Sequence, residues 1–156
     1  MIPELVEIKN APWEVLPCGI HKATLAEVKK FFGTNPHRRE LFEGLVRALI
    51  ALHIAGCRTV YLDGSYVTGK PKPNDYDACW DPAGIDPKKL DPVFFDFDNL
   101  RANQKQIFFG EFFPSIANGV PGQPILEFFQ RERYTGAAKG ILLIDLTSDP
   151  LLGKES

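Results

Sequence analysis

The longest helix that the pattern of apolar and polar positions predicts covers residues 35–56, NPHRRELFEGLVRALIALHIAG. Asn35 suits the N-cap, Pro36 suits the first helical position, and Gly56 suits the end of the helix. The apolar residues of this segment recur at helical spacing, so they predict one face that packs against a core. They are Leu41, Phe42, Leu45, Val46, Leu49 and Ile50.

A shorter helix is predicted over residues 21–33, HKATLAEVKKFFG. Thr24 and Glu27 have the spacing of a capping box, in which each side chain hydrogen-bonds the backbone at the other position. Gly33 suits the end of this helix. The two helices therefore follow each other closely along the chain.

Three apolar runs rich in β-branched and aromatic residues predict strands over 58–65 (RTVYLDGS), 75–81 (DYDACWD) and 140–148 (GILLIDLTS). Glycine and proline exclude regular structure from several connections. The predicted loops cover 67–74, 82–92 and 119–124.

The remaining segments give weaker patterns. A third helix is expected to start near Asp98 or Asn99, within residues 98–113. Residues 125–133, ILEFFQRER, fit a helix or a strand equally. Two terminal segments complete the chain: residues 1–20 are expected to be irregular and residues 149–156 to form a flexible tail.

This order of helices and strands predicts a single α/β (α+β) domain over residues 1–156, with a small mixed β-sheet flanked by helices. A chain of 156 residues has the usual size of one domain with one core. Its 12 phenylalanines, many of them in pairs such as Phe31-Phe32, leave two interpretations open: a phenylalanine-rich core, or an exposed surface for a partner.

Charge and cysteine content narrow the function classes. The net charge is −2, so bulk electrostatics gives no argument for nucleic-acid binding. Cys18, Cys57 and Cys79 are widely spaced, which argues against a structural zinc site and against a disulfide framework. No segment has the pattern of a signal peptide or of a membrane span. We therefore expect a cytoplasmic protein without a membrane partner.

Candidate chemistry concentrates in residues 63–81, DGSYVTGKPKPNDYDACWD. On a strand, Asp75 and Asp77 point to the same face, and two neighbouring carboxylates repel each other unless a cation lies between them. Mg²⁺ is typically held by one or two carboxylates together with phosphate oxygens of a substrate. The pair therefore predicts a magnesium–nucleotide site.

The turn before the pair fits the same chemistry. Gly64 allows the backbone to approach a phosphate closely, and Ser65 adds a hydroxyl donor. Lys70 and Lys72 lie in the following loop, where their charge can neutralise phosphate. The alternative is structural, with Asp75 as a turn residue and Asp77 on an exposed strand face.

The segment YLDGSYVTGKPKPNDYDACW resembles the signature of the polymerase-beta-like nucleotidyltransferase superfamily: a strand that ends in Gly-Ser, a short loop, and Asp-x-Asp on the next strand. Within it, the chain is most similar to the minimal nucleotidyltransferases of bacteria and archaea. The family carries a third carboxylate on a later strand, and Asp145 in GILLIDLTS matches that setting.

The resemblance implies a metal-dependent nucleotidyltransferase that transfers a nucleoside monophosphate from an NTP. Asp75, Asp77 and Asp145 would be the catalytic residues and would hold Mg²⁺ or Mn²⁺. Gly64, Ser65, Lys70 and Lys72 would bind the nucleotide. The acceptor would be a protein, an RNA or a small molecule, and relatives of this kind often act with a toxin-like protein in a toxin–antitoxin or defence pair.

A second hypothesis is a catalytically inactive relative that binds and neutralises a partner or senses a nucleotide. The aromatic pairs favour it mildly, and so does the loop, since Val67 or Thr68 stands where relatives often have arginine and Asn74 stands where they often have serine. Other charged groups have structural interpretations. Asp63 is expected to form a turn, Arg101 and Lys105 to lie on a solvated helix face, and the HRR stretch at 37–39 to be a solvated turn.

Overall fold

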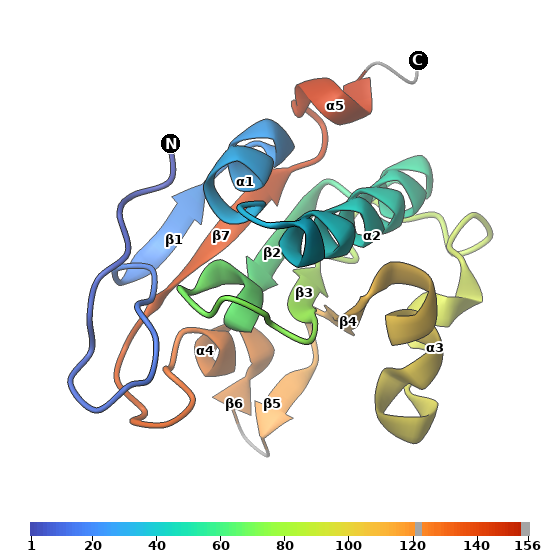
Figure 1. Ribbon diagram of the computed structural model, residues 1–156. Coiled ribbons are helices and arrows are strands. Elements are labelled where there is room, and N and C mark those ends of the chain that lie inside the picture. The colour runs from blue at the N-terminus through green and yellow to red at the C-terminus, as the bar shows by residue number, and fades with distance from the viewer. Residues whose placement is uncertain (121–122, 154–156) are drawn as a thin grey trace.

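A five-stranded mixed sheet forms the centre of the computed structural model, which describes residues 1–120 and 123–153, and only the backbone of 118–120 and 153 (Figure 1). The outer neighbours in the sheet pair in parallel, and the two inner pairings are antiparallel. The predicted single α/β domain with a mixed sheet is thereby confirmed. In spatial order the strands are β1 (Gly19–Lys22), β7 (Gly140–Asp145), β2 (Thr59–Asp63), β3 (Tyr76–Trp80) and β4 (Gly110–Pro114).

Two helices, α1 (Leu25–Phe32) and α2 (Pro36–Ile54), cover one face of this sheet (Figure 1). Both predicted caps are present. The Thr24 hydroxyl accepts from the Glu27 N–H at 3.2 Å, and the Asn35 side-chain oxygen accepts from the Arg38 N–H at 2.8 Å. The apolar stripe of α2 packs against alternate residues of the strands and forms the main core.

The segment 98–113, predicted to contain a helix that starts near Asp98 or Asn99, holds that helix and a strand. Helix α3 (Asp98–Phe108) ends where Phe109 adopts a left-handed conformation with φ of 65°, and β4 follows at once. The prediction missed this strand because its apolar residues continue those of the helix without a break. The ambiguous segment 125–133 begins with a short helix, α4 (Ile125–Phe129).

Two further expectations were wrong in part. Strand β1 begins inside the segment expected to be irregular and runs into the predicted helix; its mostly exposed side chains give no alternating signal. The expected loop at 119–124 contains parts of a small second sheet, although residues 121–122 lie outside the described residues. That sheet pairs β5 (Asn118–Val120) with β6 (Gln123–Pro124).

The predicted flexible tail is not flexible along its whole length, because residues 149–153 pack on the domain. Asp149 is buried, its carboxylate accepts from the Leu25 N–H at 2.8 Å, and Leu152 lies in the main core. This contact caps the start of α1 and leads into the short helix α5 (Pro150–Gly153). The rest of the predicted tail, residues 154–156, lies outside the described residues.

The phenylalanine pairs combine both interpretations of the sequence. In each of the five pairs one ring is buried while its neighbour is partly or fully exposed, as Phe94 and Phe95 show. The buried members are Phe32, Phe94, Phe108, Phe112 and Phe129. Pairing thus supplies the core, and the outer rings remain at the surface. Within residues 1–120 and 123–153, no helix is both long and apolar enough to cross a membrane.

Candidate functional site

Four carboxylates gather at one end of the sheet, on the face opposite α1 and α2. In the strand register Asp63 on β2 pairs with Asp77 on β3, and Asp77 pairs with Glu111 on β4. Neighbouring strands lie about 4.8 Å apart, so these side chains form a row across three strands. Asp75 lies just before β3. We call Asp63, Asp75, Asp77 and Glu111 the carboxylate cluster.

The predicted alternation of β3 holds in the structure. Tyr76 and Ala78 point into the main core beneath the helices. On the opposite face, Cys79 packs in a second small core, while Asp77 and Asp75 line the same cavities. The two aspartates therefore share one face, as their spacing predicts.

Asp75 and Asp77 differ from the other two members of the cluster because no described side chain neutralises them by an ion pair. Burial raises the pKa of Asp75, and Glu111 adds to the increase. Burial and the neighbouring carboxylates raise the pKa of Asp77 well above its usual value. Among the described residues, neither side chain accepts a hydrogen bond. More distant lysine and arginine side chains favour the charged forms, but burial outweighs them. We call the pair uncompensated, because no described side chain forms an ion pair or a hydrogen bond with it.

The outer two carboxylates are compensated. The buried Lys139 ammonium donates to the Asp63 carboxylate, and both side chains are more than 90% buried. Lys105 forms an ion pair with Glu111 at 3.1 Å. Asp63 is thus a buried ion-pair residue, whereas the sequence suggested a turn former. Lys105 also faces the cluster, contrary to its expected place on a solvated helix face.

Gly64 brings the backbone against the aspartate pair. Its φ is 87°, a conformation that favours glycine. A Cβ atom here would lie 2.9 Å from the Asp77 backbone nitrogen and 3.1 Å from an Asp77 carboxylate oxygen. Ser65 follows at the start of a short 3₁₀ turn (Ser65–Val67). The predicted Gly-Ser turn therefore adjoins Asp77, and both of its residues line the cavity described next.

The larger of two cavities at the cluster has a volume of about 620 Å³. Gly64, Ser65 and Lys70 line it together with the aspartate pair, as predicted. Lys72 does not line it and is exposed, so its predicted contact with a nucleotide is not supported. The wall also includes Trp13, Arg131, Arg133, Tyr134 and Lys139. We call this hollow the Trp13 cavity.

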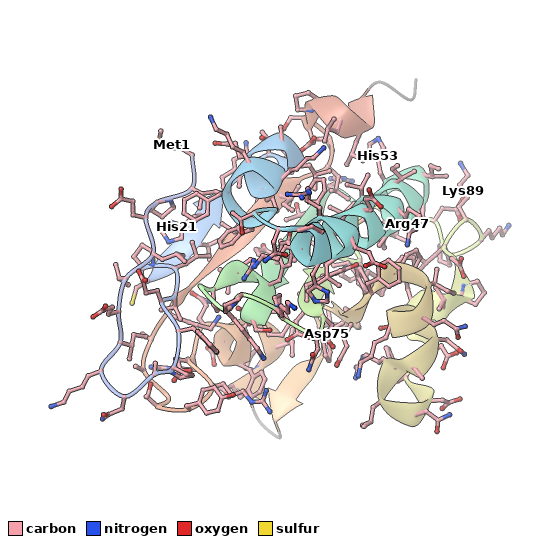
Figure 2. The ribbon with its side chains drawn as sticks, in the orientation of Figure 1. Met1, His21, Arg47, His53, Asp75 and Lys89 are labelled. Atoms are coloured by element: carbon pink, nitrogen blue, oxygen red, sulfur yellow. The ribbon has the colours of Figure 1, made fainter. Side chains whose placement is uncertain are left out.

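A second cavity of about 560 Å³ opens on the other side of the same pair. Arg101, Glu111 and Phe113 line it, and the Arg101 guanidinium stacks over the Phe113 ring at 3.9 Å. We call it the Arg101 cavity. Asp75 and Asp77 border both cavities, so a group bound in either one can reach the pair. Figure 2 labels Asp75 in the lower half of the molecule, near the start of β3.

The loop after the Gly-Ser turn is held by the start of α2. Arg38 is only 3% exposed, and its guanidinium donates to the backbone carbonyls of Tyr66 at 2.6 Å and Thr68 at 2.8 Å, and also to that of Lys70. His37 donates to the Pro73 carbonyl at 2.5 Å. The HRR stretch, expected to be a solvated turn, instead fixes the loop that carries Lys70.

Asp145 does not belong to the carboxylate cluster, and its prediction as the third catalytic and metal-binding residue is therefore not supported. It pairs with Thr59 at the start of β2, four residues from Asp63. At about 3.3 Å per residue this separates the two positions by roughly 13 Å. Its carboxylate accepts from the Thr147 hydroxyl at 2.7 Å, and this hydrogen bond lowers its pKa. Glu111 occupies the position on a neighbouring strand that the sequence assigned to Asp145.

The donor set allows one test of whether a divalent cation fits. In the described part of the chain, no three histidine, cysteine, aspartate or glutamate side chains are placed so that they could hold a metal ion. Two uncompensated carboxylates are present, and Mg²⁺ commonly binds one or two carboxylates and takes its other oxygens from phosphates and water. Asp75 and Asp77 thus fit a cation that arrives with a phosphate ligand.

A protein-family model described as a family of unknown function, DUF6932, matches residues 9–145. The chain belongs to this family. The match extends from the N-terminal segment to the end of β7, so it includes the whole carboxylate cluster. No curated protein and no solved structure matches the chain significantly.

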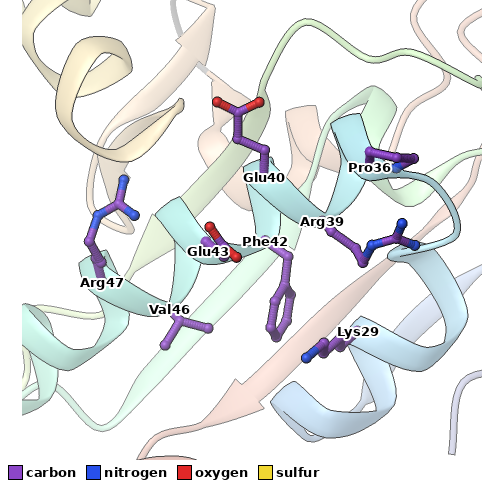
Figure 3. Close-up of a pocket in the computed structure, with 8 residues that line it drawn as sticks. All are labelled: Lys29, Pro36, Arg39, Glu40, Phe42, Glu43, Val46 and Arg47. Atoms are coloured by element: carbon purple, nitrogen blue, oxygen red, sulfur yellow. The ribbon is translucent and has the colours of Figure 1, made fainter.

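The DUF6932 chain also has a hollow on its helical side, of about 670 Å³ (Figure 3). Lys29, Arg39 and Arg47 line it together with Glu40 and Glu43. Lys29 comes from α1 and the other four from the exposed side of α2, and the two signs of charge are mixed, as on a solvated helix surface. The hollow lies on the other side of the sheet from the carboxylate cluster and is not part of the site.

Sequence reasoning missed Glu111 and Lys139. Glu111 follows a glycine in GEFFP, where the two phenylalanines were the available signal for a strand. Lys139 gave no such signal, because it stands in the glycine-containing segment YTGAAKG and meets Asp63 only through the pairing of distant segments. Trp13 also reaches the site from the segment expected to be irregular.

Proposed function

We propose that this DUF6932 protein is a metal-dependent nucleotidyltransferase that transfers a nucleoside monophosphate from an NTP to an acceptor. The observation that carries the proposal is the uncompensated pair of Asp75 and Asp77 in one cavity with the Gly64–Ser65 turn. This is the arrangement that the resemblance to polymerase-beta-like nucleotidyltransferases leads one to expect.

Each residue has a defined role in the proposal. Asp75 and Asp77 hold Mg²⁺ or Mn²⁺, which supplies positive charge to the triphosphate oxygens. The Ser65 hydroxyl and nearby backbone N–H groups donate to phosphate oxygens. Lys70, which lines the same cavity, adds a cation. Glu111 replaces Asp145 as the third carboxylate, after release from Lys105.

In the proposed reaction, an acceptor hydroxyl oxygen bonds to the α-phosphorus and loses its proton. The bond from the α-phosphorus to the oxygen that bridges to the β-phosphorus breaks, and pyrophosphate leaves. The acceptor is a protein, an RNA or a small molecule, and a toxin-like partner protein is one candidate. A cytoplasmic location, where NTPs are present, belongs to the same proposal.

The second candidate function is that of an inactive relative that binds a partner or a nucleotide. The ion pair of Glu111 with Lys105 favours it, because among the described residues this leaves two carboxylates rather than three for a cation. The two candidates differ in one measurable respect, which is covalent transfer of a nucleotide.

Label transfer tests the proposal directly. The protein is incubated with each of the four NTPs carrying an α-³²P label, with Mg²⁺ or Mn²⁺, and with a cell lysate as the source of acceptor. We expect covalent labelling with at least one NTP that the lysate alone does not give, and no such protein-dependent labelling when the label is on the γ-phosphate. Asp77→Asn should reduce labelling at least about 1,000-fold, which corresponds to roughly 4 kcal/mol.

Asp145→Asn is the matched control, since it removes a strand carboxylate at the opposite end of the sheet and should transfer normally. Glu111→Gln should reduce transfer if Glu111 is the third carboxylate. Absence of transfer with all four NTPs would leave the inactive relative as the better account. Equal transfer by Asp77→Asn and the unchanged protein would refute the assigned site.

A further inference from the structure

The wall of the Trp13 cavity combines two kinds of chemistry. Besides the aspartate pair and the Gly64–Ser65 turn, it includes two exposed aromatic rings, those of Trp13 and Tyr134. Trp13 is 38% exposed and Tyr134 is 63% exposed. A cavity of about 620 Å³ is within the usual range for a site that binds a small molecule. Its size and lining thus suit a cation-bound ligand that carries both phosphate groups and a flat ring.

The turn that carries Tyr134 is fixed by its own hydrogen bonds. The Glu132 carboxylate accepts from the backbone N–H groups of Tyr134 at 2.9 Å and Thr135 at 2.7 Å. Gly136, with φ of 72°, closes the turn by donating to the Glu132 carbonyl at 2.8 Å. The exposed Tyr134 ring therefore projects from a preorganised support, which reduces the entropy lost when a ligand stacks on it.

The segment that carries Trp13 is fastened to the loop of the site. Val15 forms a bridge with Thr68, and the Gly69 N–H donates to the Glu14 carbonyl at 2.9 Å. Thr68 and Gly69 belong to the loop that Arg38 holds. Trp13 thus has a fixed place beside the same loop that carries Lys70, although it comes from a remote part of the sequence.

Positive charge lines the same cavity. Arg131, Arg133 and Lys70 line the cavity along with the aromatic rings and the aspartate pair. The guanidinium of Arg133 lies 5.7 Å from the centre of the Tyr134 ring. Arginine and lysine side chains pair with phosphate oxygens, while an aromatic ring can stack on any of the nucleobases.

We propose that Trp13 and Tyr134 form a nucleobase-binding subsite, so that the Trp13 cavity takes a whole nucleoside triphosphate with its base on these rings and its phosphates toward Gly64 and Lys70. This inference rests on the proposed function for the direction of the phosphates. The subsite assigns the residues that bind the base, which the proposed function does not name. The Arg101 cavity then remains for the acceptor.

Calorimetric titration of the full chain tests the subsite with two probes, ATP and inorganic tripolyphosphate, both in the presence of Ca²⁺ to limit turnover. Trp13→Ala should weaken ATP binding roughly 5- to 100-fold, the usual effect of losing one stacked ring. Tyr134→Ala should act in the same direction. Tripolyphosphate has no base, so both variants should bind it within about twofold of the unchanged protein.

Two further variants control for structural effects. Trp13→Phe keeps a ring and should retain most of the ATP affinity. Phe95→Ala removes an exposed ring that does not line the cavity and should leave both affinities unchanged. Tryptophan fluorescence adds an independent signal, because Trp80 is buried and Trp13 is exposed. ATP should quench the emission of the unchanged protein, and Trp13→Phe should lose that quenching while it still binds ATP.

The outcomes separate this subsite from the transferase proposal. Unchanged ATP affinity in Trp13→Ala and Tyr134→Ala, equal loss of ATP and tripolyphosphate binding, or no ATP binding by the unchanged protein would each overturn the subsite. Tighter binding of a short RNA without a triphosphate would overturn the assignment to an NTP. Selective loss of ATP affinity without any label transfer would support the subsite and refute the transferase.

Discussion

The two ends of the sheet carry the same type of residue in opposite electrostatic states. At one end, burial and neighbouring carboxylates raise the pKa of Asp77. At the other end, the Thr147 hydroxyl hydrogen-bonds Asp145 and lowers its pKa, with Lys22 nearby at 3.8 Å. Both aspartates lie on the same face of the sheet, but among the described residues Asp77 has no ion-pair or hydrogen-bond partner, whereas Asp145 has both. The contrast indicates that the fold maintains an unfavourable carboxylate pair at the Asp77 end of the sheet.

Such a pair is expected at a functional site, because a protein without a use for it would gain stability by neutralising it. The surroundings of the pair are correspondingly well fixed. Gly64 adjoins Asp77, and Arg38 holds the following loop. Replacing a carboxylate of the pair should therefore raise the free energy of unfolding while it abolishes nucleotide transfer. Replacing Asp145 should lower the free energy of unfolding slightly and leave transfer unchanged.

The largest effect on stability is expected at Arg38. Arg38→Ala removes donors from the buried carbonyl groups of Phe32 and Tyr66 and from two partly buried ones, and each buried acceptor left unsatisfied costs about 1–3 kcal/mol. We therefore expect a loss of about 3 kcal/mol or more in the free energy of unfolding, measured by urea denaturation. Arg39→Ala is the control, because Arg39 is exposed and makes one hydrogen bond, to the Gly33 carbonyl at 3.3 Å. Similar losses in the two variants would contradict the role of Arg38.

The next effect concerns Gly64. Gly64→Ala and Gly136→Ala both place a side chain at positive φ. Gly64 also has a ψ of −176°, a combination that essentially only glycine adopts, where strain costs roughly 1–3 kcal/mol. Only the Cβ at 64 would also collide with Asp77, while nothing lies within 4 Å of a Cβ at 136. We expect Gly64→Ala to lose at least about 1 kcal/mol more than Gly136→Ala, since overpacking costs about 1–3 kcal/mol. Equal losses in urea denaturation would show that the Gly64 turn has room to move.

The first two helices, the three predicted strands and the shared face of Asp75 and Asp77 followed from local patterns, because capping boxes, helical stripes and alternation act over a few residues. The third member of the cluster did not. Strand β7 runs antiparallel to β2, so its last residue, Asp145, must lie at the start of β2. Strand β4 runs parallel to β3, so Glu111 lies beside Asp77. Strand direction depends on long-range pairing, which the local pattern does not contain.

The burial of Arg38 was equally hidden from the sequence. An arginine in HRR resembles a surface residue in any local pattern, and its partners are backbone carbonyls about 30 positions away. Backbone acceptors leave no mark on the sequence. Lys139 likewise pairs with a residue that is distant in the sequence, Asp63. Sites assembled from such contacts become visible only when the chain is folded.

A smaller effect is expected for Asp77→Asn, and it is a gain rather than a loss in the free energy of unfolding. The raised pKa means that the folded protein favours the neutral form, so stability falls as the pH rises above about 3.8, the usual value of an aspartate. A neutral amide at this position would remove the cost of a buried charge. We therefore expect the free energy of unfolding to rise by roughly 0.5–2 kcal/mol at pH 7, while nucleotide transfer is lost. Thermal unfolding at pH 4 and pH 8 checks it: the gain should be larger at pH 8.

The smallest change in the free energy of unfolding is expected for Asp145→Asn, at the other end of the sheet. The lowered pKa of Asp145 means that the charged form stabilises the fold above the usual aspartate value of about 3.8, and that this stability is lost as the pH falls through the lower folded pKa. Asp145→Asn should therefore cost about 0.5 kcal/mol at pH 7 and less in acid, since the group is partly exposed. The pH dependence then has the opposite sign to that of Asp77→Asn. The same sign for both aspartates in thermal unfolding would mean that the two ends of the sheet do not differ in compensation, and the case for an uncompensated pair at Asp75 and Asp77 would fail.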